Sequence, residues 1–154
     1  MRDFNDADKK KKQTRIKIPD NPAGLTGEMH ARLTNEVRGS LREDNLPCNV
    51  AFKIARDAGV PRIAVGEIAD RLGIRVTNCQ IGCFKVDKII YEESTDKKID
   101  EDILSKLEAL KKNDELTCAN VFELSGRLKL PPMAVANVAN ARNLKVRQCQ
   151  LGCF

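Results

Sequence analysis

The chain of 154 residues contains one sequence unit twice, with the two copies 70 positions apart. Residues 46–84 align with residues 116–154 without a gap, and 13 of the 39 aligned pairs are identical. The copies close with the phrases Cys-Gln-Ile-Gly-Cys-Phe and Cys-Gln-Leu-Gly-Cys-Phe. A period this long predicts one folded unit duplicated in tandem. Each unit then has roughly 60 residues and a thin core, which favours docking on its twin, a metal or dimerisation.

Composition excludes several classes of protein. Aromatic residues make up 4% of the chain, with one Tyr and no Trp, which argues against a base-stacking surface for single-stranded nucleic acid. No run of 18 apolar residues occurs and the first residues are charged, so we expect neither a membrane span nor a secretory signal. The expected compartment is the cytoplasm, where cysteines are kept reduced.

The net charge of +5 is distributed unevenly. Residues 1–20 hold seven basic and four acidic groups, and residues 116–154 have a net charge of +4. One interpretation of the first segment is a solvated arm. The functional alternative is an arm that lies along DNA phosphates. Its candidate contacts are Lys9, Lys10, Lys11, Lys12, Arg15 and Lys17.

Apolar spacing and capping residues predict the same helix order in both halves. Thr26 is expected to cap the first helix of one unit, and Asp100 the first helix of the other. Further helices are expected over 47–58, 62–72, 117–128 and 132–142, with short strands at 74–76 and 144–146. The predicted domains are a basic arm (1–22), a first repeat (23–86), a charged linker (87–98) and a second repeat (99–154).

The stretch from Phe52 to Ile74 resembles the helix-turn-helix of transcription regulators. Two helices joined by a tight turn need a small residue where they cross and a left-handed residue in the turn. In the first copy these positions are Ala55 and Gly59, followed by the inward residues Val65 and Ile68. The matching positions of the second copy are Ser125, Lys129, Val135 and Val138. Lys129 departs from the pattern, so the second turn is expected to differ in detail.

The resemblance implies that the third helix of each unit enters a DNA major groove. The residues expected to face outward are Arg62, Glu67, Asp70 and Arg71 in the first copy and Asn137, Asn140 and Arg142 in the second. Asn suits adenine and Arg suits guanine, whereas carboxylates are repelled by phosphate. The second unit is therefore the better candidate reader. The alternative is that both helix pairs only pack for stability, with these polar side chains solvated.

Each repeat carries three cysteines in the spacing C-x30-C-x3-C. Three interpretations stay open: buried structural thiols, a zinc site or iron–sulfur cluster, and a redox or disulfide switch. The two later thiols of a copy can approach each other only if Gly82 or Gly152 turns the chain, because an extended segment would hold their Cα atoms about 13 Å apart. The candidate ligands or redox residues are Cys48, Cys79, Cys83, Cys118, Cys149 and Cys153.

Enzymatic motifs are absent from the sequence: there is no Gly-rich phosphate loop, no G-x-S-x-G and no H-E-x-x-H, and His30 is the one histidine. We therefore expect no enzyme. The run from Val65 to Val76, with the Cys-Gln-Ile-Gly-Cys-Phe phrase after it, resembles small helix-turn-helix-type proteins of anaerobic bacteria and archaea that end similarly; this likeness supports the unit and not an activity.

The expected fold is mainly α, with two tandem helix-turn-helix (winged-helix-like) units that are each closed by a short β-strand. The expected function is DNA binding, with duplex DNA as partner and transcriptional regulation as the role. The alternatives are a metal- or redox-sensing protein that uses the cysteines with iron–sulfur or zinc, and a protein-interaction adaptor that forms a homodimer or binds another protein.

Overall fold

The computed structural model describes residues 18–83 and 97–154 of the chain. Within them the fold is mainly helical, as predicted, with six helices and one two-stranded parallel sheet. The predicted DNA contacts of the basic arm, Lys9 to Lys12, Arg15 and Lys17, lie outside the described residues. No helix in the described part of the chain is long and apolar enough to cross a membrane.

The chain divides into two compact units, and their boundaries fall inside the two cysteine phrases. The first unit holds the described residues up to Cys79 together with Gln150–Phe154. The second unit is Gln80–Cys149. Each unit thus contains the residues that follow the second cysteine of the other repeat. The tandem repeat in the sequence is therefore not a simple division of the chain into two consecutive units.

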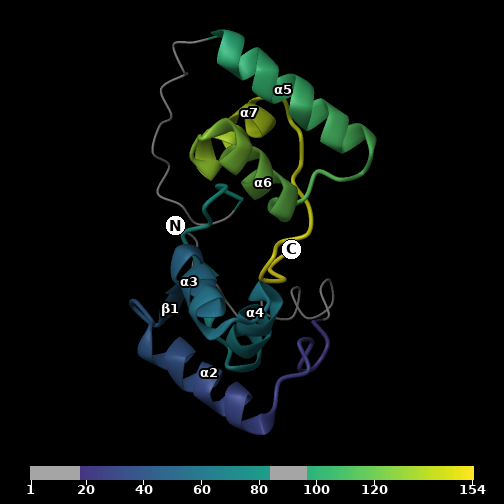
Figure 1. Ribbon diagram of the computed structural model, residues 1–154. Coiled ribbons are helices and arrows are strands. Elements are labelled where there is room, and N and C mark those ends of the chain that lie inside the picture. Colours follow the sequence, from purple (N-terminus) through teal and green to yellow (C-terminus); the bar gives the residue numbers. More distant parts are fainter. Residues whose placement is uncertain (1–17, 84–96) are drawn as a thin grey trace. The chain divides into compact units, whose positions relative to one another are not determined.

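In the first unit three helices pack on one another (Figure 1). The short strand before the second of these helices pairs with the short strand after the third in a parallel sheet. Thr26 caps the first helix as predicted, because its Oγ1 accepts a hydrogen bond from the backbone N–H of Met29 at 3.2 Å. The core residues Leu33, Val37, Val65 and Ile68 are 0–1% exposed. The elements are α2 (Gly27–Gly39), β1 (Asn45–Pro47), α3 (Cys48–Ala58), α4 (Arg62–Arg71) and β2 (Arg75–Thr77).

The second unit repeats the three helices as α5 (Lys97–Lys112), α6 (Cys118–Leu128) and α7 (Pro132–Ala141), with α7 packed on both others. Its buried Ile103, Leu107 and Val135 lie 70 positions after Leu33, Val37 and Val65, so the duplication includes the first helix. The prediction that Asp100 caps this helix is wrong. The helix begins at Lys97, and Asp100 lies in its first turn, where a carboxylate still favours the positive helix end.

The strands differ most from the prediction. In the first unit β2 pairs in parallel with β1, and Leu46 lies opposite Val76. The alternation of apolar and polar residues did not predict β1. In the second unit the expected strand at 144–146 is reduced to a single parallel bridge between Thr117 and Arg147. There Cys118 N donates to Arg147 O, and Arg147 N donates to Leu116 O, both at 2.9 Å. The copies therefore bring the same two segments together with different lengths of ladder.

The turn between the second and third helices is the same in both units. Gly59 (φ 66°) and Lys129 (φ 54°) both adopt the left-handed conformation. The next residues close equivalent hydrogen bonds, from Val60 N to Ala55 O at 2.9 Å and from Leu130 N to Ser125 O at 3.0 Å. The expectation that Lys129 changes this turn is therefore wrong. A lysine here carries a conformational cost, because its Cβ crowds the backbone at positive φ.

Replacing Lys129 by glycine is expected to raise the free energy of unfolding by about 1 kcal/mol, because glycine has no Cβ to strain the turn. Urea denaturation measures the effect. Lys106→Gly is the control, since Lys106 lies inside α5 and glycine there should lower the free energy of unfolding by about 1 kcal/mol. Destabilisation by both substitutions would contradict the assigned turn conformation.

Candidate functional site

The third helix of the first unit, α4, is buried over most of its length. Ala64, Val65, Gly66, Glu67, Ile68 and Ala69 are six consecutive buried residues, so more than one side of this helix is covered. A helix that reads a major groove needs an exposed face for base contacts. The expectation that Glu67 faces outward is wrong, since it is 4% exposed.

Glu67 is paired with Arg71 one turn further along α4 and lies beside His30 of α2. Arg71 Nε donates to Glu67 Oε1 at 2.8 Å, and Arg71 Nη2 donates to the same oxygen. On the other side, His30 Nε2 of α2 lies 3.4 Å from Glu67 Oε2. Arg71 also reaches Asp20 Oδ1 at 3.5 Å. The predicted DNA residue Arg71 is therefore held beside two carboxylates, although half of its side chain is exposed.

Arg62, the other predicted DNA residue of α4, is engaged by two neighbours in the first unit. Its guanidinium lies 3.8 Å from the centroid of the Phe52 ring on α3, a cation–π contact. Arg62 Nη1 donates to the side-chain oxygen of Gln150 at 2.7 Å. Gln150 lies 88 positions later in the sequence, in the second cysteine phrase. Arg62 thus positions residues 150–154 on the first unit.

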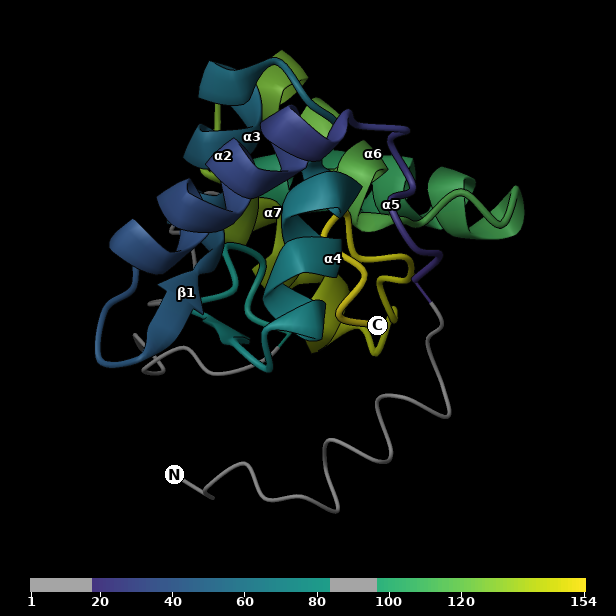
Figure 2. The same cartoon turned by 90° about the horizontal axis from the view of Figure 1, so that it is seen from below.

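Gly66 lets the backbone of these residues approach α4 closely. A Cβ built on Gly66 would lie 2.0 Å from the carbonyl oxygen of Leu151, far inside van der Waals contact. The Leu151 side chain is 1% exposed. Gly152 follows with φ 71°, and its missing side chain leaves room for Ile18 and Ile63. Figure 2 shows the yellow segment that ends at the C label beside α4.

We call residues 150–154 the docked tail, and the residues that receive it (Ile18, Arg62, Ile63 and Gly66) the tail-binding surface. The prediction of functional residues from the sequence missed this surface. One local signal was available: glycine inside a helix costs about 1 kcal/mol relative to alanine, so an interior glycine such as Gly66 indicates a close backbone approach. Which segment approaches is not encoded locally.

In the second unit the predicted DNA residues are more accessible. Asn140 and Arg142 are exposed at the end of α7, and Asn137 is half-buried. Lys145, just beyond, is also exposed. Among the described residues neither Arg142 nor Lys145 takes part in an ion pair, in contrast to Arg71 of the first unit. Asn140, Arg142 and Lys145 therefore form an exposed polar and basic group within one unit.

The cysteines divide into buried and accessible thiols. Cys48, Cys79 and Cys118 are 3–5% exposed, Cys149 and Cys153 are half-buried, and Cys83 is exposed. Gly82 (φ 68°) and Gly152 (φ 71°) both place a turn between the paired cysteines, so the extended alternative does not occur. Over residues 18–83 and 97–154, no group of three or more His, Cys, Asp and Glu side chains is arranged to hold a metal ion. The zinc, iron–sulfur and redox hypotheses continue to rest on the sequence spacing.

Comparisons with protein-family models, with curated proteins and with solved structures find no match to this chain.

Proposed function

We propose that the second unit binds duplex DNA through the end of α7 and the segment after it. The observation that carries the proposal is the exposure of Asn140, Arg142 and Lys145 in one stretch of this unit. Arginine and lysine bind phosphate or guanine, and asparagine pairs with adenine. After Glu123 the sequence has five basic residues and no acidic one, so this stretch contains no carboxylate side chain.

The local backbone supports this assignment. The helix pair α6 and α7 has a left-handed turn residue, Lys129, and a small buried residue, Ser125, whose hydroxyl donates to the carbonyl of Phe122 at 2.8 Å. These are the two features that the resemblance to helix-turn-helix regulators depends on. In this proposal α7 is the reading helix, and α4 of the first unit is not, because its arginines Arg62 and Arg71 are already engaged by Phe52, Gln150 and Glu67.

Binding of the full chain to a labelled duplex of about 25 base pairs tests the proposal. With about four phosphate contacts, affinity is expected to fall by about two orders of magnitude between 50 and 200 mM salt. Arg142→Ala is expected to weaken binding by about tenfold. Fluorescence anisotropy measures both effects.

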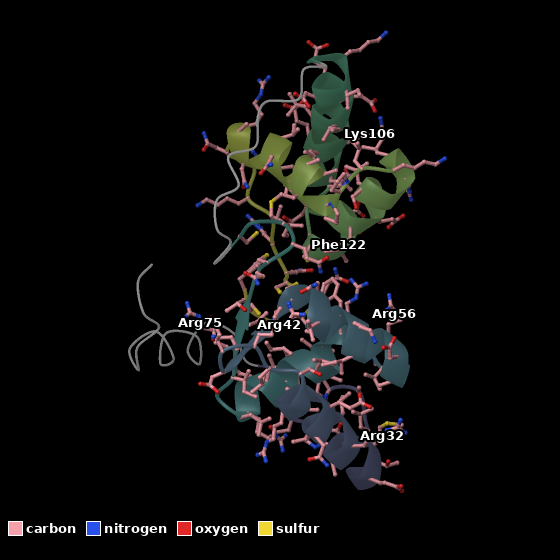
Figure 3. All side chains as sticks on the ribbon, turned by 90° about the vertical axis from the view of Figure 1, so that its left-hand side faces the viewer. Arg32, Arg42, Arg56, Arg75, Lys106 and Phe122 are labelled. Carbon is pink, nitrogen blue, oxygen red and sulfur yellow. The ribbon has the colours of Figure 1, made fainter. Side chains whose placement is uncertain are left out.

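The matched control is Arg32→Ala, which removes one positive charge from α2 of the first unit, where Arg32 projects outward with 74% exposure (Figure 3). It should leave the affinity within about twofold, because Arg32 belongs to the first unit and is not one of the proposed contacts, and an exposed charge that makes no contact is largely screened. Absence of binding at 50 mM salt would refute the proposal. Equal losses from Arg32→Ala and Arg142→Ala would also refute it, as would binding that depends only on residues 1–17.

A further inference from the structure

Arg147 lies on the same side of the second unit's extended last segment as Lys145. Leu144 is buried and Val146 is half-buried, whereas Lys145 and Arg147 are exposed. This alternation is that of an extended chain, in which every second side chain points to the same face. The backbone of Arg147 forms the parallel bridge to Thr117, so the position of the segment in the unit is fixed. The two basic side chains therefore face solvent together.

The first unit has neither this charge nor this exposure at the matching positions. Four positions at the end of the third helix and just after it differ between the copies: Asp70, Leu72, Arg75 and Thr77 correspond to Asn140, Arg142, Lys145 and Arg147. The four residues are half-buried in the first unit and exposed in the second. One acidic and one basic residue give a charge of 0 in the first unit, and three basic residues give +3 in the second. The second unit thus differs from the first as binding of a polyanion requires.

A carboxylate of the same unit holds the Arg147 guanidinium. Arg147 Nη1 donates to Asp114 Oδ1 at 3.1 Å, and the two side chains are 71% and 85% exposed. Asp114 lies in the turn after α5 with φ 59°, and its N–H donates to Lys111 O at 3.1 Å. The matching aspartate of the first unit, Asp44, has the same φ, but Thr77 occupies the position of Arg147. This ion pair therefore belongs to the second unit alone.

A phosphate offers Arg147 a stronger partner than Asp114 does. An ion pair as exposed as this one contributes little, because water screens it and both side chains lose freedom. A guanidinium binds phosphate through two parallel hydrogen bonds, and each neutralised phosphate releases counterions from DNA. A duplex held by Lys145 brings its phosphates to the face that Arg147 shares. The carboxylate of Asp114 is then repelled by the phosphate and has lost its partner.

Building on the proposed binding of duplex DNA, we propose that Arg147 is a further phosphate contact of the second unit, and that it exchanges Asp114 for a DNA phosphate when the duplex binds. Asp114 is thereby a competitor that lowers the affinity of this site for DNA.

Fluorescence anisotropy with the full chain and the labelled duplex tests both parts. Arg147→Ala is expected to weaken binding by about fivefold at about 100 mM salt. It should also reduce the slope of log affinity against log salt concentration by about 0.9, the value for one phosphate contact. Asp114→Asn is expected to strengthen binding by about threefold, because it releases the guanidinium and removes the repulsion. Asparagine tolerates positive φ as aspartate does, so the turn is kept. A gain of affinity cannot result from misfolding.

The double variant distinguishes an exchange of partners from a general effect of charge. In the Arg147→Ala background, Asp114→Asn should change the affinity by less than about 1.5-fold. The matched control is Asp102→Asn, which removes the same charge from the exposed ion pair with Lys106 on α5. Asp102 lies about 15 Å along the helix axis from Lys112 at the end of α5, beyond the screening length of about 10 Å. It should leave the affinity within about 1.5-fold.

The outcomes separate this inference from the function on which it rests. Absence of duplex binding at about 50 mM salt would overturn both. Binding that is weakened by Arg142→Ala but unchanged by Arg147→Ala would overturn the inference and leave the proposed function in place. Equal gains from Asp114→Asn with and without Arg147 would also overturn it, since the carboxylate would then act on DNA without the arginine.

Discussion

Leu151→Ala is expected to destabilise the first unit by about 2–5 kcal/mol, the usual cost of deleting a buried leucine side chain. Residue 151 lies in the second repeat of the sequence, but its side chain is 1% exposed and its backbone covers Gly66 of α4. Hydrogen exchange followed by mass spectrometry should show faster exchange in peptides from α3 and α4. Peptides from α6 should retain their protection.

The reciprocal substitution, Ile81→Ala, tests the same assignment from the other unit. Ile81 is also 1% exposed and belongs to the second unit, so Ile81→Ala should accelerate exchange in α6 and α7 and spare α4. Ile99→Ala is the control, because Ile99 is 44% exposed and should change stability by no more than about 0.5 kcal/mol. The opposite result would be faster exchange in the second unit for Leu151→Ala and in the first unit for Ile81→Ala. That result would contradict the assignment of residues 150–154 to the first unit and of residues 80–83 to the second.

Glu67→Ala is expected to lower the free energy of unfolding of the first unit by about 2 kcal/mol, within the range for losing hydrogen bonds to a charged group. The substitution removes the carboxylate that Arg71 binds at 2.8 Å and leaves a gap beside His30. Because Arg71 is half-exposed, water compensates part of the loss on its side. Urea denaturation, with hydrogen exchange of α2 and α4 as a local measure, tests the prediction.

The chain supplies a matched control in Glu123→Ala. Glu123 and Arg127 have the same i, i+4 spacing on α6 as Glu67 and Arg71 on α4, but the Glu123 side chain is 57% exposed and that of Glu67 is 5% exposed. Exposed pairs of this kind contribute about 0.3–0.5 kcal/mol. Equal losses from the two alanine substitutions would show that burial is not the reason for the importance of Glu67.

Local sequence signals predicted most of the helical fold. Thr26, Gly59 and the apolar stripe through Leu33 and Val37 act over one or two helical turns, and such signals can be recognised without knowing the rest of the structure. The strand β1 was missed because three residues are too few to show an alternating pattern. Asp100 was misassigned as a cap because an acidic residue is equally favourable inside the first turn.

The candidate site was predictable only in part. Asn140 and Arg142 were expected to face outward and are exposed. Arg62 and Arg71 were chosen by the same helical periodicity, yet one is held by Phe52 and Gln150 and the other by Glu67 and Asp20. Periodicity places a side chain on a face of a helix, but it does not say whether a distant segment covers that face.

The sequence by itself determined the repeat, the helices and the left-handed turn at Gly59, because each depends on neighbouring residues or on identity between the copies. The structure decided that Lys129 keeps the same turn and that Gly82 and Gly152 bend both cysteine phrases. Only the tertiary structure decided where the tails dock. The two phrases differ at one position, Ile81 in one and Leu151 in the other, and both residues are buried, so local chemistry does not distinguish docking on the own unit from docking on the other. The choice depends on Arg62 and Gly66, which lie more than 80 positions before the residues that they contact.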